Sequence, residues 1–187
     1  MLPPDSKLEQ ATQPVWSVGV RVLHWVLALS MSTSFLTHEG TGRLHEWTGY
    51  AALVAAGLRV FLGFFGSGRW RFSQFLQGAS VTWTYTRAIA NHTELRYLGH
   101  NPLGGWMVVA LLADAIATGL TGWLFTTDRF WGVQWLEELH SVLGRALIPL
   151  LLLHIAGAVF TSWRHRENLV AAMLHGRKPA AGPEDIA

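Results

Sequence analysis

The chain has 187 residues, of which 50% are hydrophobic and 14% charged, and its formal net charge is +2. This composition, with a positive mean hydropathy, is unlike that of a soluble globular protein and predicts a small integral membrane protein. The absence of cysteine excludes disulfides, thiolate metal sites, iron–sulfur clusters and covalent attachment of a c-type haem.

Four apolar segments, at about 18–37, 45–65, 103–125 and 140–162, are long enough to cross a bilayer core of about 30 Å. The N-terminus lacks the basic region, apolar run and small-residue cleavage site of a signal peptide, so the first segment is expected to be a retained span. Arg21, near its start, is placed to snorkel to the membrane surface. Pro102 is suited to the start of the third helix.

The remaining segments are polar. Residues 1–17 and 164–187 are expected to be tails, with a short basic amphipathic segment after 164 and a mobile end. The run Phe72–Ala90 within the middle loop is amphipathic and is expected to lie in the membrane interface. Several tryptophans near predicted helix ends are expected to be interface anchors: Trp16, Trp47, Trp106, Trp123 and Trp163.

Charge predicts the orientation, because cytoplasmic loops carry an excess of Lys and Arg. The side of the two tails and the middle loop carries Lys7, Arg21, Arg69, Arg71, Arg87, Arg96, Arg164, Arg166, Arg177 and Lys178. The other side carries only Arg43 and Arg129, with Glu39, Glu46, Asp128, Glu137 and Glu138. The predicted fold is therefore an all-α, integral membrane four-helix bundle over 18–163 with both termini cytoplasmic.

Histidines are the chemically informative residues of these spans. His140 and His154 are fourteen residues apart, which places them within about 40° on one helix face and about 21 Å apart along it. His24 and His45 lie at matching depths on other helices. An intramembrane imidazole suggests a function, and two pairs, His24 with His154 and His45 with His140, are what two b-type haems need as axial ligands.

Each histidine has a simpler reading on its own. A histidine at a helix end, such as His45 or His140, is more often a surface contact, whereas His154 lies in a wholly apolar run. The joint pattern of two depths with two members each favours ligation. Five histidines in loops or tails are treated as non-ligands: His38, His92, His100, His165 and His175.

Other polar or small residues in the spans have two readings each. Gly49 and Gly144 follow their histidines by four residues, which either leaves room for a flat macrocycle or serves close helix packing. Arg59 either contacts a haem propionate or snorkels inward. Arg145 is a candidate to contact the propionates of the outer haem or to pair with Asp114. Asp114 is either a proton relay or a protonated or hydrogen-bonded interior group.

The chain resembles the prokaryotic cytochrome b561 family, in the branch with hydrogenase-type cytochrome b subunits. The matching stretches are RVLHW, HEWTGYAALVAAGLRVFLGFFGS, RFSQFL, YLGHNPLGGWMVVALL, LHSVLGRALIPLLLLHIAGAVF and RENLVAAMLHGRK. The resemblance implies a bundle with two haem b groups that exchanges electrons between membrane quinone and a partner. His24, His45, His140 and His154 match the family's ligand positions.

Three functions are compatible with these features. The first is a quinone-linked electron-transfer protein of the bacterial inner membrane that serves a periplasmic c-type cytochrome or similar redox protein; the acidic outer face favours a cationic partner. The second is a superoxide oxidase that reduces ubiquinone, for which the outer loop charges have the wrong sign to steer an anion. The third is a non-haem metal-binding membrane protein that uses the same histidines.

The predicted partners are the lipid bilayer, ubiquinone or menaquinone and the redox protein, with a second copy of the chain as a further candidate and no nucleic acid. A quinone pocket has no short motif in this sequence. Its candidate residues lie near the inner end of the bundle: Arg21, Arg59, His100, Asn101 and Trp106.

Overall fold

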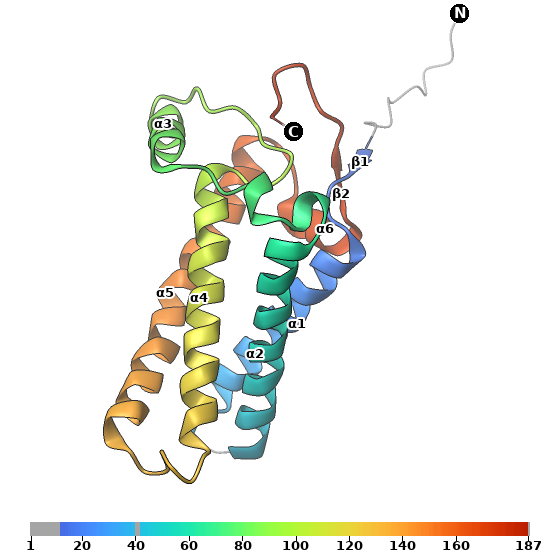
Figure 1. Cartoon of the computed structure of the whole chain (residues 1–187). Coiled ribbons are helices and arrows are strands. Elements are labelled where there is room, and N and C mark those ends of the chain that lie inside the picture. The colour runs from blue at the N-terminus through green and yellow to red at the C-terminus, as the bar shows by residue number, and fades with distance from the viewer. Residues whose placement is uncertain (1–11, 40–41, 187) are drawn as a thin grey trace, which may run out of the picture.

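The structure is a computed structural model that describes residues 12–39 and 42–186. Four long helices stand side by side in it: α1 (Val18–Leu36), α2 (Gly42–Phe65), α4 (Pro102–Phe125) and α5 (Gln134–Arg164) (Figure 1). All four are long and apolar enough to cross a membrane. The predicted all-α membrane four-helix bundle is confirmed. For α1, α2 and α4, both ends lie within three residues of the predicted bounds. Helix α5 begins six residues earlier than predicted, because its first turns contain polar residues that the apolar pattern does not include.

Helix starts follow the local sequence. The side chain of Ser17 accepts a hydrogen bond from the Val20 amide at 3.4 Å at the start of α1. At the start of α4, the Asn101 side chain accepts one from the Gly104 amide at 2.7 Å and Pro102 occupies the first turn, as predicted.

The bundle packs α1 on α2, α2 on α4 and α4 on α5. Small residues let these helices approach closely: Ala56 and Ala115 are buried with Leu112 in the centre, against Phe72 and Met31. The outward faces are apolar, and on α5 Leu152 is 62% exposed and Leu153 60% exposed. Such faces fit a lipid environment, in which apolar side chains need no protein cover.

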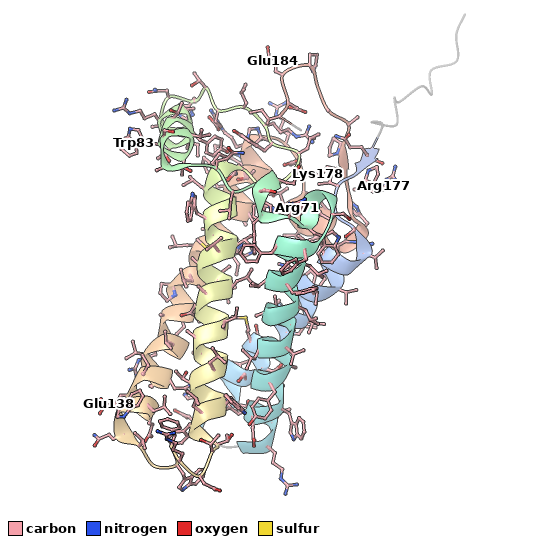
Figure 2. All side chains as sticks on the ribbon, viewed as in Figure 1. Arg71, Trp83, Glu138, Arg177, Lys178 and Glu184 are labelled. Atoms are coloured by element: carbon pink, nitrogen blue, oxygen red, sulfur yellow. The ribbon has the colours of Figure 1, made fainter. Side chains whose placement is uncertain are left out.

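One end of the bundle carries both described terminal segments and the middle loop, and we call it the tail end (Figure 1). The other, the loop end, carries the α1–α2 and α4–α5 connections. Figure 2 shows the labelled charged residues at these two ends, with Glu138 at the loop end and Arg71, Arg177, Lys178 and Glu184 at the tail end. The long helices between them form the apolar part of the molecule.

The middle loop differs from its predicted form. The run Phe72–Ala90, which was expected to lie in the membrane interface as a whole, consists of a short 3-10 turn, η2 (Phe72–Gln74), followed by α3 (Ala79–Ala90). Phe72 packs against the bundle core and Phe75 is only 5% exposed, so these rings seal the tail end of the bundle. Only α3, with Trp83 on its surface, remains suited to the interface (Figure 2).

Over their described residues, the two expected tails contain secondary structure, including a helix within the amphipathic segment expected after residue 164. Strand β1 (Thr12–Pro14) pairs antiparallel with β2 (Arg177–Pro179), and α6 (Leu169–His175) precedes β2. Trp16 is not an interface anchor: it is 8% exposed and packs with Val15, Val20 and Ala172. Residues 1–11 lie outside the described residues.

An ion cluster around buried Glu167 connects the segments at the tail end. Glu167 accepts hydrogen bonds from Arg96 at 3.0 Å and from Lys178 at 3.1 Å, and Arg96 also contacts Asp185 at 2.5 Å. The side chains of Glu167 and Lys178 are 1% and 2% exposed. The cluster therefore joins the middle loop to the C-terminal segment, and the sequence alone offered no signal for these pairs.

Candidate functional site

The loop-end histidine pair comes from the first turn of α2 and the second turn of α5. The ring centroids of His45 and His140 are 6.0 Å apart, and their planes are nearly perpendicular at 85°. Both side chains are half-buried. The structure therefore brings together two imidazoles that are 95 positions apart in the sequence.

Each of these two imidazoles is held through Nδ1. Nδ1 of His45 lies 2.8 Å from the Ser34 carbonyl oxygen and 3.2 Å from the Ser34 hydroxyl. Nδ1 of His140 lies 3.0 Å from the Thr118 carbonyl oxygen and 3.1 Å from the Thr121 hydroxyl. A carbonyl only accepts, so Nδ1 carries the proton and Nε2 of each ring keeps its lone pair for a metal. Sequence reasoning missed Ser34, Thr118 and Thr121, since no spacing within one helix reveals a contact between two helices.

A cavity of about 620 Å³ lies beside this pair. Its lining includes both histidines together with Gly49, Gly144 and Arg145. Apart from the adjoining residues of its own helix, a Cβ added at Gly144 would have no heavy atom of the described chain within 4 Å, and one at Gly49 would meet the Ser34 hydroxyl at 3.7 Å. Helix packing therefore does not require glycine at Gly144, and the volume is in the range of cofactor pockets, about 300–1,000 Å³.

The tail-end pair comes from α1 and α5. The ring centroids of His24 and His154 are 6.2 Å apart, with an angle of 47° between the planes. His24 also meets the edge of the Trp25 ring, at a centroid distance of 5.3 Å. Within the described residues, no hydrogen bond to either imidazole is found. The two pairs thus share their spacing but differ in how their rings are held.

The spacing of both pairs fits an iron held between imidazoles. A bond from a metal to an imidazole nitrogen is about 2 Å, and the nitrogen lies about 1 Å from the ring centre, so two rings on one metal have centres about 6 Å apart. The donor set of two neutral imidazoles, the adjoining cavity and the glycine left open at Gly144 agree with a haem at the loop end. In the described part of the chain, no three or more His, Cys, Asp or Glu side chains converge to hold a bare metal ion.

Arg59 does not snorkel to the surface. It is 6% exposed, donates a hydrogen bond to the Trp70 carbonyl at 3.0 Å, and its guanidinium carbon lies 5.3 Å from the centre of the Phe72 ring. No carboxylate pairs with it among the described residues. It is a buried cation at the tail end of the bundle.

The partner role of Arg145 for Asp114 is not realised. Arg145 is exposed and lines the loop-end cavity, and no ion pair joins it to Asp114 within the described residues. Oδ2 of Asp114 and the hydroxyl of Thr118, one helical turn further along α4, are buried and have no hydrogen-bond partner among the described residues.

His100 lies just before α4, between the rings of Trp16 and Phe75, at centroid distances of 4.8 and 4.7 Å. Burial, followed by the positive charge of Arg59, lowers the pKa of His100 to about 3. The guanidinium carbon of Arg59 lies 5.8 Å from the centre of the same Phe75 ring, so Phe75 connects His100 with Arg59 at the tail end.

The remaining residues considered for a quinone site have structural contacts. The Arg21 guanidinium donates to the Leu174 carbonyl and so binds α6 instead of snorkelling. Trp106 donates from Nε1 to the Gln77 carbonyl at 3.1 Å. Asn101 caps α4.

Comparison with protein families identifies a matching family. The family described as prokaryotic cytochrome b561 matches residues 15–176, which include all four long helices and both histidine pairs. A comparison with curated proteins finds no match. Since the match spans most of the chain, the chain belongs to the prokaryotic cytochrome b561 family of membrane-bound, haem b-binding electron-transfer proteins.

Proposed function

We propose that this protein carries electrons across the bacterial inner membrane between the quinone pool and a periplasmic redox partner such as a c-type cytochrome. The observation that carries the proposal is the pair of matched ring separations, 6.2 Å for His24 with His154 and 6.0 Å for His45 with His140. They would hold two haem b groups, one near each end of the bundle.

Bis-histidine haem b supplies reversible one-electron chemistry with no open coordination position. The chain's own residues define where that chemistry takes place. Ser34 and Thr118 orient the loop-end imidazoles through their carbonyls, and the rings of Phe72 and Phe75 close the tail end against water. Arg59 at the tail end and Arg145 at the loop end are the cations proposed for the propionates.

Orientation is part of the proposal. The tail end carries most of the arginines outside the helices, so we assign it to the cytoplasm by the positive-inside rule. The loop end then faces the periplasm with Glu39, Glu46, Asp128, Glu137 and Glu138 against Arg43 and Arg129. This net negative charge supports a cationic protein partner over an anionic substrate such as superoxide.

The decisive experiment measures haem b per chain by the pyridine haemochrome assay on the purified protein. We expect two, and we expect His154→Ala to lose the tail-end haem while keeping the other. A ratio of one or zero in the wild type would refute the two-haem function. Added quinol should then reduce the haems, and a protein insensitive to quinols would retain only a relay role between proteins.

A further inference from the structure

The two histidine pairs are held differently, and this difference has a consequence for redox potential. In the loop-end pair, each Nδ1 contacts both a backbone carbonyl and a side-chain hydroxyl. Ser34 provides both groups to His45, whereas Thr118 provides the carbonyl and Thr121 the hydroxyl to His140. In the tail-end pair, neither imidazole has such a contact within the described residues. Both pairs present two imidazoles at similar separations, 6.0 and 6.2 Å, although the angle between the ring planes also differs, 85° against 47°.

An acceptor on Nδ1–H makes the imidazole a stronger donor to its metal. A stronger donor stabilises the oxidised iron more than the reduced iron, because the oxidised iron carries one more positive charge. Hydrogen bonds to ligand atoms are accordingly one of the means by which a protein sets a haem potential. The contacts at His45 and His140 would therefore lower the potential of a haem held between these two imidazoles.

Nearby charges act in the same direction. Arg59 is a buried cation without a carboxylate partner among the described residues, and it lies at the tail end of the bundle, as the His24–His154 pair does. A positive charge opposes oxidation of a neighbouring iron and raises its potential. The loop-end cavity is instead lined by two carboxylates, Glu46 and Glu137, against the single cation Arg145.

We propose, on the basis of the two-haem function above, that the loop-end haem has the lower midpoint potential and that Ser34 and Thr121 are positioning residues that keep it low. Electron transfer is then downhill from the loop end to the tail end. If both haems are bound, one electron would pass from the loop-end group, which would be oxidised, to the tail-end group, which would be reduced. No proton or co-reactant is needed for this internal step.

The test is optical redox titration of the purified full chain, with two one-electron components expected. Ser34→Ala and Thr121→Val should each raise the lower potential by about 30 mV, a threefold change in the redox equilibrium constant, since tenfold corresponds to about 59 mV for one electron. Each substitution removes the hydroxyl and leaves the carbonyl acceptor in place, so a partial shift is expected. Arg59→Gln should lower the higher potential instead.

Two controls separate this effect from general disturbance. Thr121→Ser keeps a hydroxyl and should keep the wild-type potential. Ser32→Ala changes an exposed hydroxyl on the same helix as Ser34 and should shift neither component. In His24→Ala, the haem that is retained should titrate at the lower of the two potentials.

Two results would overturn the inference while leaving the proposed function intact. One is a pair of hydroxyl variants with two haems per chain and unchanged potentials. The other is a His24→Ala protein whose remaining haem titrates at the higher potential. If Thr121→Val does not fold, Ser34→Ala and Arg59→Gln decide, because they act on opposite components. Fewer than two haems in the wild type refutes the proposed function itself.

Discussion

Replacing Gly144 by leucine tests whether the loop-end cavity holds a cofactor. Gly144 lies on α5 one turn after His140 and lines the cavity of about 620 Å³. Beyond the adjoining residues of its own helix, a Cβ at this position meets no atom of the described chain within 4 Å. The protein without haem should therefore accept the new side chain, whereas a macrocycle against this turn would not.

The two effects have opposite signs and comparable size. Glycine in a helix interior costs about 0.5–1 kcal/mol relative to a good helix former, so the substitution should stabilise the haem-free chain by about that amount. Extra carbons forced against a packed group cost about 1–3 kcal/mol. If this cost falls on the haem, its binding weakens by about 5- to 140-fold, because 1.4 kcal/mol is a factor of ten.

The assay combines haem content per chain with thermal unfolding of the haem-free protein. The matched control is Gly57→Leu on α2, where an added Cβ also meets nothing within 4 Å and which does not line the cavity. Both variants should gain stability, but only Gly144→Leu should lose haem. Two haems bound with wild-type affinity in Gly144→Leu would show that no macrocycle lies against this helix turn.

Three further predictions concern the tail end. Glu167→Gln removes the carboxylate that buried Lys178 shares with Arg96, whereas Arg96 keeps its contact with Asp185. Local unfolding of the C-terminal segment, measured by limited proteolysis, should become easier by up to about 3–5 kcal/mol, while Glu184→Gln, at an exposed position, should change little. Gly63→Ala places a Cβ 2.2 Å from the Phe72 ring, so the thermal midpoint should fall despite the gain in helix propensity; a midpoint at or above that of the wild type would show that the ring moves freely. The pKa of His100 is lowered from 6.5 to about 3 in the folded protein. Between these pH values the unfolded chain binds a proton at this residue and the folded chain does not, so the free energy of unfolding should fall as the pH drops from about 6.5 towards 3. His100→Phe should flatten that dependence in denaturation at several pH values, and equal slopes in the two proteins would contradict it.

Much of the architecture can be read directly from the chain. A bilayer admits only structures that satisfy their own backbone hydrogen bonds, so four apolar runs of about twenty residues already require four helices. Helix rise then converts the spacing of His140 and His154 into two depths, and His24 and His45 match those depths. Family membership follows from the same stretches and is confirmed by the match over residues 15–176.

Other features depend on how the helices are rotated relative to one another and on which loops fold back on them. Helix periodicity gives no information on either. Lipid and protein interior are equally apolar, so hydropathy does not indicate that Phe72 and Phe75 face inward or that Arg59 is buried between them. The ordering of the tails likewise arises from long-range contacts, such as those of Lys178 with Glu167 and of β1 with β2.

The amino-acid order by itself determined the membrane class, the number of spans and the two levels at which imidazoles lie, because these depend only on length and rise along one helix. Only the tertiary structure decided which hydroxyls and carbonyls hold each ring, where the buried cation lies and how the termini close the bundle. Those contacts join residues from different helices, and their formation depends on the relative rotation of whole elements rather than on spacing within any one of them.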